Sequence, residues 1–151
     1  MKGDHIRYRA GYKYQLVNDY RVQTDIRPDY NIMTEFIELD CSGVMLIRHG
    51  YAWDGPSNPI YCLIPFFILK HLIKTFMRGS LVHDVTAQLI RDGYLGEEWV
   101  TPSNRELKKI CIEDGMTRIR AQAVFIGVEY LNNRSWAKYW SDGNKPLMNA
   151  P

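Results

Sequence analysis

The sequence predicts an α+β fold, with a small N-terminal antiparallel β region followed by three to four packed helices. Short runs in which apolar and polar residues alternate occupy the chain up to residue 49. After a loop rich in proline and glycine, the apolar period changes to that of helices. The chain has 151 residues, of which 46% are hydrophobic, and this is enough for one domain with a buried core.

Residues 12–26, YKYQLVNDYRVQTDI, contain two short runs separated by Asn18 and Asp19. Asparagine and aspartate tolerate turn geometry, so this segment predicts a β-hairpin. Residues 32–40 and 44–49 predict two further strands, joined by the turn CSG. Met45 and Ile47 are expected on the face opposite to that of their neighbours in the second of these strands.

Residues 50–59 read GYAWDGPSNP. Two glycines and two prolines make this stretch too irregular for a helix and too rich in proline for a central strand, so we expect a shaped loop. Tyr51 and Trp53 are expected to be aromatic anchors of the core or of the loop.

The rest of the chain predicts helices. Residues 65–76 predict a short helix, and residues 79–93 a longer one that ends at Gly93. Its expected buried face consists of Leu81, Val82, Val85, Leu89 and Ile90. Ser103 and Glu106 have the spacing of a capping box, which predicts a helix from Asn104 to Gly115. Thr117 is expected to cap a last helix, on which one apolar stripe comprises Ile119, Ala123, Ile126 and Tyr130.

We expect a single domain over residues 1–135 and an aromatic tail over residues 136–151, docked on the domain or on a partner. The tail contains Trp136, Tyr139 and Trp140. Trp136 and Trp140 are four residues apart and would form an apolar ridge on a helix, which indicates a protein interface.

Charge and composition limit the classes of partner. The net charge of +2 is scattered along the chain, so no nucleic acid partner is expected. No apolar run approaches the roughly 20 residues of a membrane span, and no signal peptide is recognised, which predicts a protein of the cytoplasm. Three cysteines, Cys41, Cys62 and Cys111, have no CxxC spacing and are expected to be reduced, partly buried thiols.

His83 and Asp84 are the first candidates for chemistry. Adjacent residues of a helix point in different directions, so this pair cannot by itself be a hydrogen-bonded dyad. An orienting carboxylate for His83 is therefore sought elsewhere, and Asp54 in the loop is the best candidate. No GxSxG, HExxH or glycine-rich phosphate motif is present, and His49, His71 and Asp114 are the only further residues suited to a metal site.

Three interpretations of these residues stay open. In the first, His83 with Asp54 and Asp84 activates water as a general base or as a metal site. In the second, a structural clasp, Asp54 accepts N–H bonds in its turn, Trp53 packs on the helices, and His83 is a hydrogen-bonded, half-buried side chain. Arg78 then forms an ion pair with an acid such as Asp54. The third is a pocket that binds a ligand or partner without turnover.

Three segments of the chain are to be taken together: GYAWDGPSNP, RGSLVHDVTAQLIRDG and NRELKKICIEDGMTRIRAQAVFIGVEYL. Through them, residues 12–135 resemble the phage and prophage family of unknown function DUF1353. The family pattern falls on Gly50, Asp54, Gly55, Ser57, His83 and Asp84. Pro56 replaces a small residue, residues 85–87 replace Ala-Leu-Tyr, and Glu106 stands where an aspartate is expected. The resemblance implies a phage or prophage origin and no established activity.

We therefore expect a phage-encoded small accessory protein that acts by protein binding, as a structural or assembly component of the virion. Its partner would be another phage or host protein, or a second copy, and a host-defence inhibitor belongs to the same binding class. It would stay in the infected host's cytoplasm or enter the virion, without a cofactor. The alternative is a small hydrolase that uses His83 with Asp54 or Asp84, assisted by a divalent metal.

Overall fold

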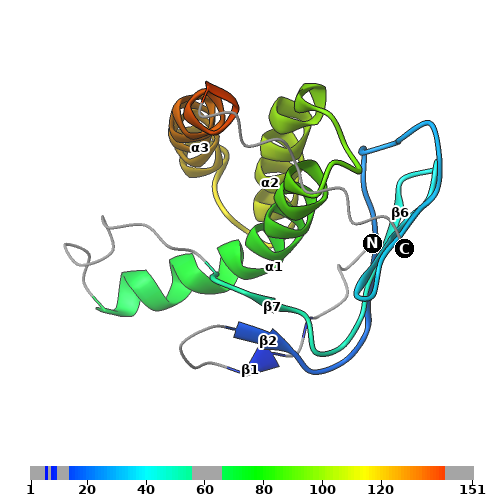
Figure 1. Ribbon diagram of the computed structural model, residues 1–151. Coiled ribbons are helices and arrows are strands. Elements are labelled where there is room, and N and C mark those ends of the chain that lie inside the picture. The colour runs from blue at the N-terminus through cyan, green and yellow to red at the C-terminus, as the bar shows by residue number, and fades with distance from the viewer. Residues whose placement is uncertain (1–5, 7, 10–13, 56–65, 142–151) are drawn as a thin grey trace.

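The computed structural model describes residues 6, 8–9, 14–55 and 66–141, and for residues 8–9, 66–72 and 131–141 it describes the backbone alone. In this part of the chain, short strands precede three helices, so the predicted α+β class is confirmed (Figure 1). The strands are β1 (Tyr8–Arg9), β2 (Tyr14–Leu16), β3 (Tyr20–Gln23), β4 (Ile32–Met33), β5 (Ile37–Leu39), β6 (Val44–Ile47) and β7 (Ala52–Trp53). The helices are α1 (Phe66–Arg91), α2 (Val100–Glu113) and α3 (Arg118–Ser141), with the 3-10 helix η2 (Glu97–Trp99) before α2.

The strands form two small antiparallel sheets, with the orders β1-β2-β7 and β3-β6-β5-β4. The hairpin predicted over residues 12–26 is wrong, because its two strands belong to different sheets. β2 pairs with β1 and β7, whereas β3 pairs with β6. Residues 14–23 thus pair with residues 44–53, and hydrogen bonds of Leu16 with Gly50 and Tyr51 continue this pairing between the sheets.

The hairpin predicted around the CSG turn is confirmed as β5 and β6. Gly43 adopts the left-handed φ of 86° that this turn requires, and the Asp40 carboxylate accepts the backbone N–H groups of Ser42 and Val44. Met45 and Ile47 are buried, as the alternation predicts. The run 32–40 is two strands instead of one, because Thr34 closes a tight turn onto Ile37.

The two helices predicted over residues 65–93 are one continuous helix, α1. Gly79 lies inside it without breaking it. A Cβ atom at Gly79 would lie 2.9 Å from Leu107 Cδ1 of α2, so the glycine permits the two helices to approach closely. The helix ends as predicted, with Gly93 at a φ of 81° and the Tyr94 N–H donating to the Leu89 carbonyl.

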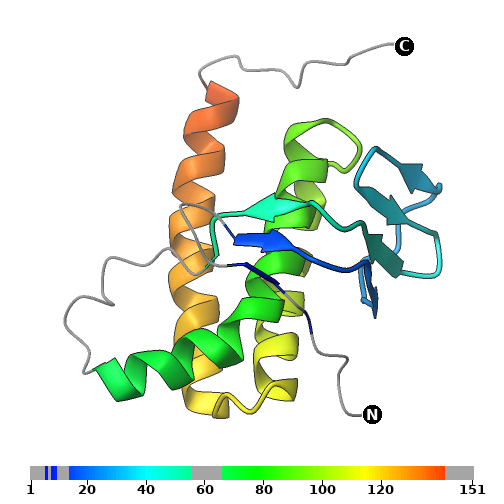
Figure 2. The same cartoon turned by 90° about the horizontal axis from the view of Figure 1, so that it is seen from below.

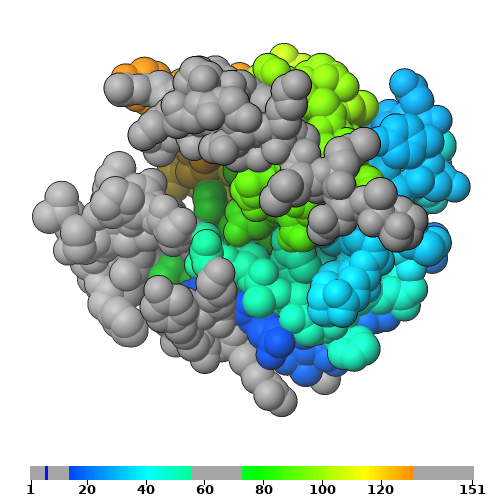
Figure 3. Space-filling model, in the orientation of Figure 1, coloured from blue at the N-terminus to red at the C-terminus, as the bar shows by residue number. Residues whose placement is uncertain are grey.

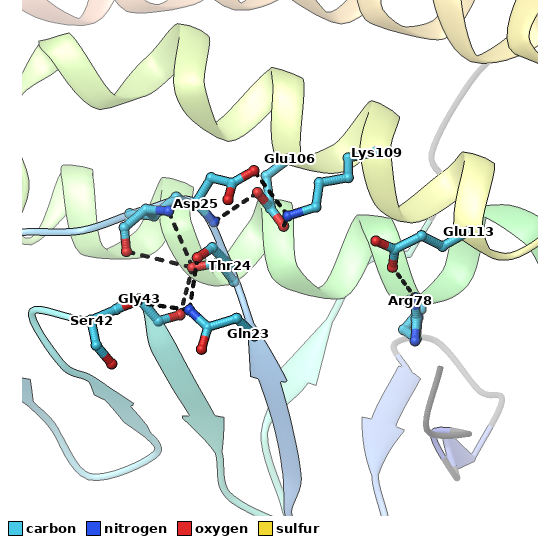
Figure 4. Close-up of polar contacts among 10 residues, drawn as sticks. Gln23, Thr24, Asp25, Ser42, Gly43, Arg78, Glu106, Lys109 and Glu113 are labelled. Atoms are coloured by element: carbon cyan, nitrogen blue, oxygen red, sulfur yellow. Dashed lines mark hydrogen bonds and ion pairs between the residues drawn. The ribbon is translucent and has the colours of Figure 1, made fainter. Parts of the chain in front are cut away.

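The predicted capping box is wrong. α2 begins at Val100, earlier than expected, so Ser103 and Glu106 lie inside the helix and are buried. The Glu106 carboxylate instead accepts the backbone N–H of Asp25 at 3.0 Å, and Lys109 contacts both acids (Figure 4). Glu106 therefore fastens α2 to the chain that leaves β3.

The inner faces of both sheets pack on α1, and the core there includes Leu16, Ile37 and Ile47 together with Leu81 and Leu89. The helical face predicted for residues 81–90 is confirmed as buried. Figure 2 shows the first sheet lying across α1, and Figure 3 shows the strand residues in blue and cyan against the green helices. A second, smaller core joins α2 to α3 through Leu107, Cys111, Met116 and Ala121.

The burial of the Glu106 carboxyl group predicts that the stability of the chain depends on pH. Burial raises its pKa above the ordinary 4.5, against the opposing effects of the Asp25 N–H and the Lys109 charge. The folded chain therefore binds this proton more tightly than the unfolded chain, so the free energy of unfolding falls as the pH rises from 4.5 through the raised pKa. We expect Glu106→Gln to remove this fall, as measured by urea denaturation at a series of pH values. Identical pH slopes for the variant and the wild-type chain would contradict this assignment.

Candidate functional site

His83 of α1 points between the helices and contacts α2. Its Nε2 lies 2.8 Å from Asn104 Oδ1, and Asn104 is completely buried. An amide oxygen only accepts hydrogen bonds, so Nε2 carries the hydrogen. This holds for the neutral and for the protonated imidazole, so the contact survives a change in the charge of His83.

The contact extends to the third helix. Asn104 Nδ2 donates to Glu129 Oε2 at 2.6 Å, and the Thr101 hydroxyl donates to Glu129 Oε1 at 2.6 Å. These hydrogen bonds therefore connect α1, α2 and α3. We call the four residues that form them the interhelical network: His83, Thr101, Asn104 and Glu129. Glu129 thus accepts one hydrogen bond on each of its two carboxyl oxygens.

Asp84 stands apart from this network. Its Oδ1 lies 3.8 Å from His83 Nδ1, which is beyond hydrogen-bond distance. This confirms that the adjacent pair is not a hydrogen-bonded dyad. If His83 acts as a base, Nδ1 is the nitrogen that accepts the proton, because Nε2 is engaged with Asn104.

The loop after β6 does meet the helix of His83. The Tyr51 hydroxyl donates to Gln88 Oε1 at 3.0 Å, and Trp53 Nε1 donates to Ser80 Oγ at 3.3 Å, so both aromatics are confirmed as anchors. Residues 52–53 form the strand β7, which corrects the expectation of an entirely irregular loop. Gly50 and Gly55 have left-handed φ angles of 88° and 71°, which other residues rarely adopt.

Asp54 and Asp84 both act on the Tyr51 hydroxyl. Burial raises the pKa of Tyr51. The negative charges of Asp84, Asp92 and, least of the three, Asp54 raise it further, and the positive charge of Arg91 lowers it. Tyr51 therefore stays protonated and donates its hydrogen bond at neutral pH. The use of Asp54 to orient His83 stays a prediction.

Arg78 forms an ion pair, as predicted, but with other acids than Asp54. Its Nη2 lies 2.8 Å from Glu113 Oε2 and its Nε 3.1 Å from Asp114 Oδ1, both at the end of α2 (Figure 4 shows the contact with Glu113). The guanidinium is almost completely buried. Arg78 therefore holds α1 to α2 and does not reach back to the loop, so it belongs to the helix packing.

The remaining candidates are dispersed. Cys111 is buried, and burial raises the pKa of its thiol to about 12, so it stays protonated. Cys41 is exposed, contrary to the expectation of partial burial. His49 pairs with Asp19 at the surface. Among the described residues, no three His, Cys, Asp or Glu side chains gather as metal ligands would. Ser57, Cys62 and the His71 side chain lie outside the described residues.

The outer face of α3 is the second candidate site. Ile119, Ala123, Ile126 and Tyr130 share one face, as predicted, but that face is exposed: Ile119 at 85%, Ile126 at 58% and Tyr130 at 61%. The opposite face packs on α2 through Ala121, Val124 and Val128. The backbone of Trp136, Tyr139 and Trp140 continues α3, and their side chains lie outside the described residues.

No protein-family model, no curated protein and no solved structure matches the chain. The resemblance to the DUF1353 family therefore stays a prediction. No helix in the part of the chain that the structure describes is long and apolar enough to cross a membrane.

Proposed function

We propose that the chain is a small phage-encoded accessory protein that binds another protein through the outer face of α3. The observation that supports this proposal is the exposure of Ile119, Ile126 and Tyr130 on one side of a helix whose other side is already buried. A surface helix normally turns one apolar stripe to the core and polar residues to water. A second, exposed stripe is typical of a helix that is covered by a partner.

The dimensions of the helices agree with this proposal. α3 has 24 residues and is about 36 Å long, whereas α2 has 14 residues and is about 21 Å long. α2 can therefore support only part of α3, which lies at the edge of the molecule (Figure 1). Trp136, Tyr139 and Trp140 belong to the last turns of α3, so the interface proposed for these aromatics and the exposed stripe belong to one helix.

The interhelical network supports the structural interpretation of His83. His83 Nε2 is bonded to a buried amide, which in turn is bonded to Glu129. Buried polar groups that are hydrogen-bonded in this way usually fix a fold. The network thereby holds α3, and with it the proposed docking face, against the rest of the domain.

The virion assignment rests on the resemblance to DUF1353 and is tested with the docking face. We expect Ile126→Glu to lower the amount of chain that co-purifies with virions at least tenfold, because burying an unpaired carboxylate in an apolar interface costs several kcal/mol. The measurement is quantitative mass spectrometry of purified virions from cells that express each variant.

Met33→Glu is the matched control, because Met33 is an exposed apolar residue at the edge strand β4, 74% accessible and on another element. We expect this variant to co-purify like the wild-type chain. Absence of the wild-type chain from virions would overturn the virion assignment. Equal losses in the two variants would overturn the assignment of the docking face to α3.

A further inference from the structure

We propose that the partner on the outer face of α3 is an acidic, amphipathic helix of another protein, which packs along the exposed stripe as the second strand of a short coiled coil. This inference names the partner of the docking face and so rests on the proposed function. The spacing of the stripe and the charges beside it support the inference.

The exposed stripe has the spacing of a coiled-coil seam. Ile119, Ala123, Ile126 and Tyr130 follow one another at intervals of four, three and four residues. All four are exposed, and the opposite face of the helix is the one that packs on α2. An apolar repeat of this kind keeps one narrow face of a helix against a second helix over several turns. The partner that this spacing indicates is therefore a helix.

The charges beside the seam favour an acidic partner. Residues that flank a coiled-coil seam pair with the flanks of the other strand and decide which strand is accepted. Arg120 occupies a flanking position and is exposed, and the sequence repeats an arginine two heptads later, at position 134. On the opposite flank, the Glu129 carboxylate accepts hydrogen bonds from Thr101 and Asn104 of α2. The arginine flank is therefore complementary to glutamate or aspartate on the partner.

Two other occupants fit these residues less well. In an antiparallel pair of two copies, the flank with Arg120 and Arg134 would meet the same flank of the other copy, and like charges repel. An anionic membrane is bound best by a broad apolar face with large side chains. The stripe on α3 is one seam wide, includes Ala123 and is bordered by Gly127.

The length of the seam sets the expected affinity. Residues 119–130 span about 18 Å of helix, which is short for a stable interface between proteins. We therefore expect a weak, transient contact, with a dissociation constant on the order of 10 to 100 µM.

A designed peptide serves as the probe. It has about three heptads, with leucine at the seam and glutamate on both flanks, so that repulsion between glutamates keeps it from pairing with itself. Because both flanks are acidic, the peptide can meet Arg120 in either direction. Fluorescence polarisation of the labelled peptide, titrated with the purified full chain up to about 500 µM, measures binding. A matched peptide with lysine in place of glutamate should bind at least tenfold more weakly, because like charges face each other.

Three variants of the chain locate the contact. Arg120→Glu should weaken binding of the glutamate peptide at least threefold and strengthen binding of the lysine peptide, an exchange that misfolding cannot produce. Ile126→Glu should weaken binding of the glutamate peptide at least tenfold, and Met33→Glu should bind it like the wild-type chain. No binding of the glutamate peptide, equal binding of both peptides, or equal losses in Ile126→Glu and Met33→Glu would overturn the inference.

The outcomes separate this inference from the proposed function. If the glutamate peptide fails to bind but Ile126→Glu still disappears from virions, the docking face stands and its partner is not an acidic helix. If the peptide binds as expected but Ile126→Glu stays in virions, the acidic-helix site stands and the virion assignment fails. Two controls test the other occupants: vesicles of phosphatidylserine and phosphatidylcholine in equal parts, and sedimentation equilibrium of the chain alone. Vesicle binding tighter than peptide binding, or a dimer of the wild-type chain, overturns the inference if Ile126→Glu abolishes it.

Discussion

Asn104→Leu is expected to lower the free energy of unfolding by about 3 kcal/mol, because it removes both hydrogen bonds of a completely buried amide. Asn104 is completely buried, accepts from His83 Nε2 at 2.8 Å and donates to Glu129 Oε2 at 2.6 Å. Leucine is branched at Cγ as asparagine is and is larger, so no cavity contributes to the loss. Urea denaturation at neutral pH, followed by circular dichroism, gives the value.

Two variants of neighbouring residues on α1 are compared with Asn104→Leu, the first as a second test and the other as the control. His83→Ala removes one partner of Asn104 and should cost about 2 kcal/mol. Asp84→Asn lies one residue away, where no hydrogen bond joins Asp84 to His83, and should change stability by less than about 0.5 kcal/mol. Unchanged or increased stability in His83→Ala would show that the histidine is held at a cost to the fold, as functional residues often are, and would favour the hydrolase interpretation.

Gly43→Ala is expected to destabilise the chain by about 4 kcal/mol, since it combines two separate penalties. Gly43 has a φ of 86°, and a Cβ atom there would lie 2.4 Å from the backbone oxygen of Thr24. That oxygen belongs to a buried turn in which Thr24 N–H and Oγ1–H both donate to the Gly43 carbonyl (Figure 4). A backbone atom fixed in this way cannot move aside as the end of a side chain could.

Gly115→Ala isolates the steric part of this effect. Gly115 also has a left-handed φ, of 96°, but a Cβ atom there would meet nothing within 4 Å. We expect it to cost only about 1 kcal/mol, the penalty of the left-handed conformation alone. Equal losses of unfolding free energy in the two variants would show that the Gly43 turn yields to the added methyl group.

Local patterns predicted the elements of this fold better than their partners. The alternation of buried residues in β6 and the 3.6-residue period of residues 81–90 follow directly from burial on one face. The hairpin at residues 12–26 failed because its strands pair with residues 44–53, which lie 21 to 39 residues further along the chain. Turn propensity at Asn18 and Asp19 contains no information about that distant pairing.

The polar contacts of α1 were only partly predictable. His83, Tyr51 and Trp53 were recognised because a histidine beside an acid and aromatics in a loop are unusual. Asn104 and Glu129 were not, because polar residues on a helix are expected to face water, and nothing in their spacing shows that two helices meet there. Periodicity has a related limit on α3: it identified the stripe of Ile119 and Ile126 but not that this stripe faces outward.

The most direct measurement places the photo-crosslinking residue p-benzoylphenylalanine at position 126, on the outer face of α3, in cells that produce the chain. Position 33, on β4, is the control, because its native methionine is also exposed. We predict a crosslinked product from position 126 and none from position 33, and its mass will identify the partner as a second copy or another protein. Equal crosslinking from both positions, or none from position 126, would contradict a docking role for α3.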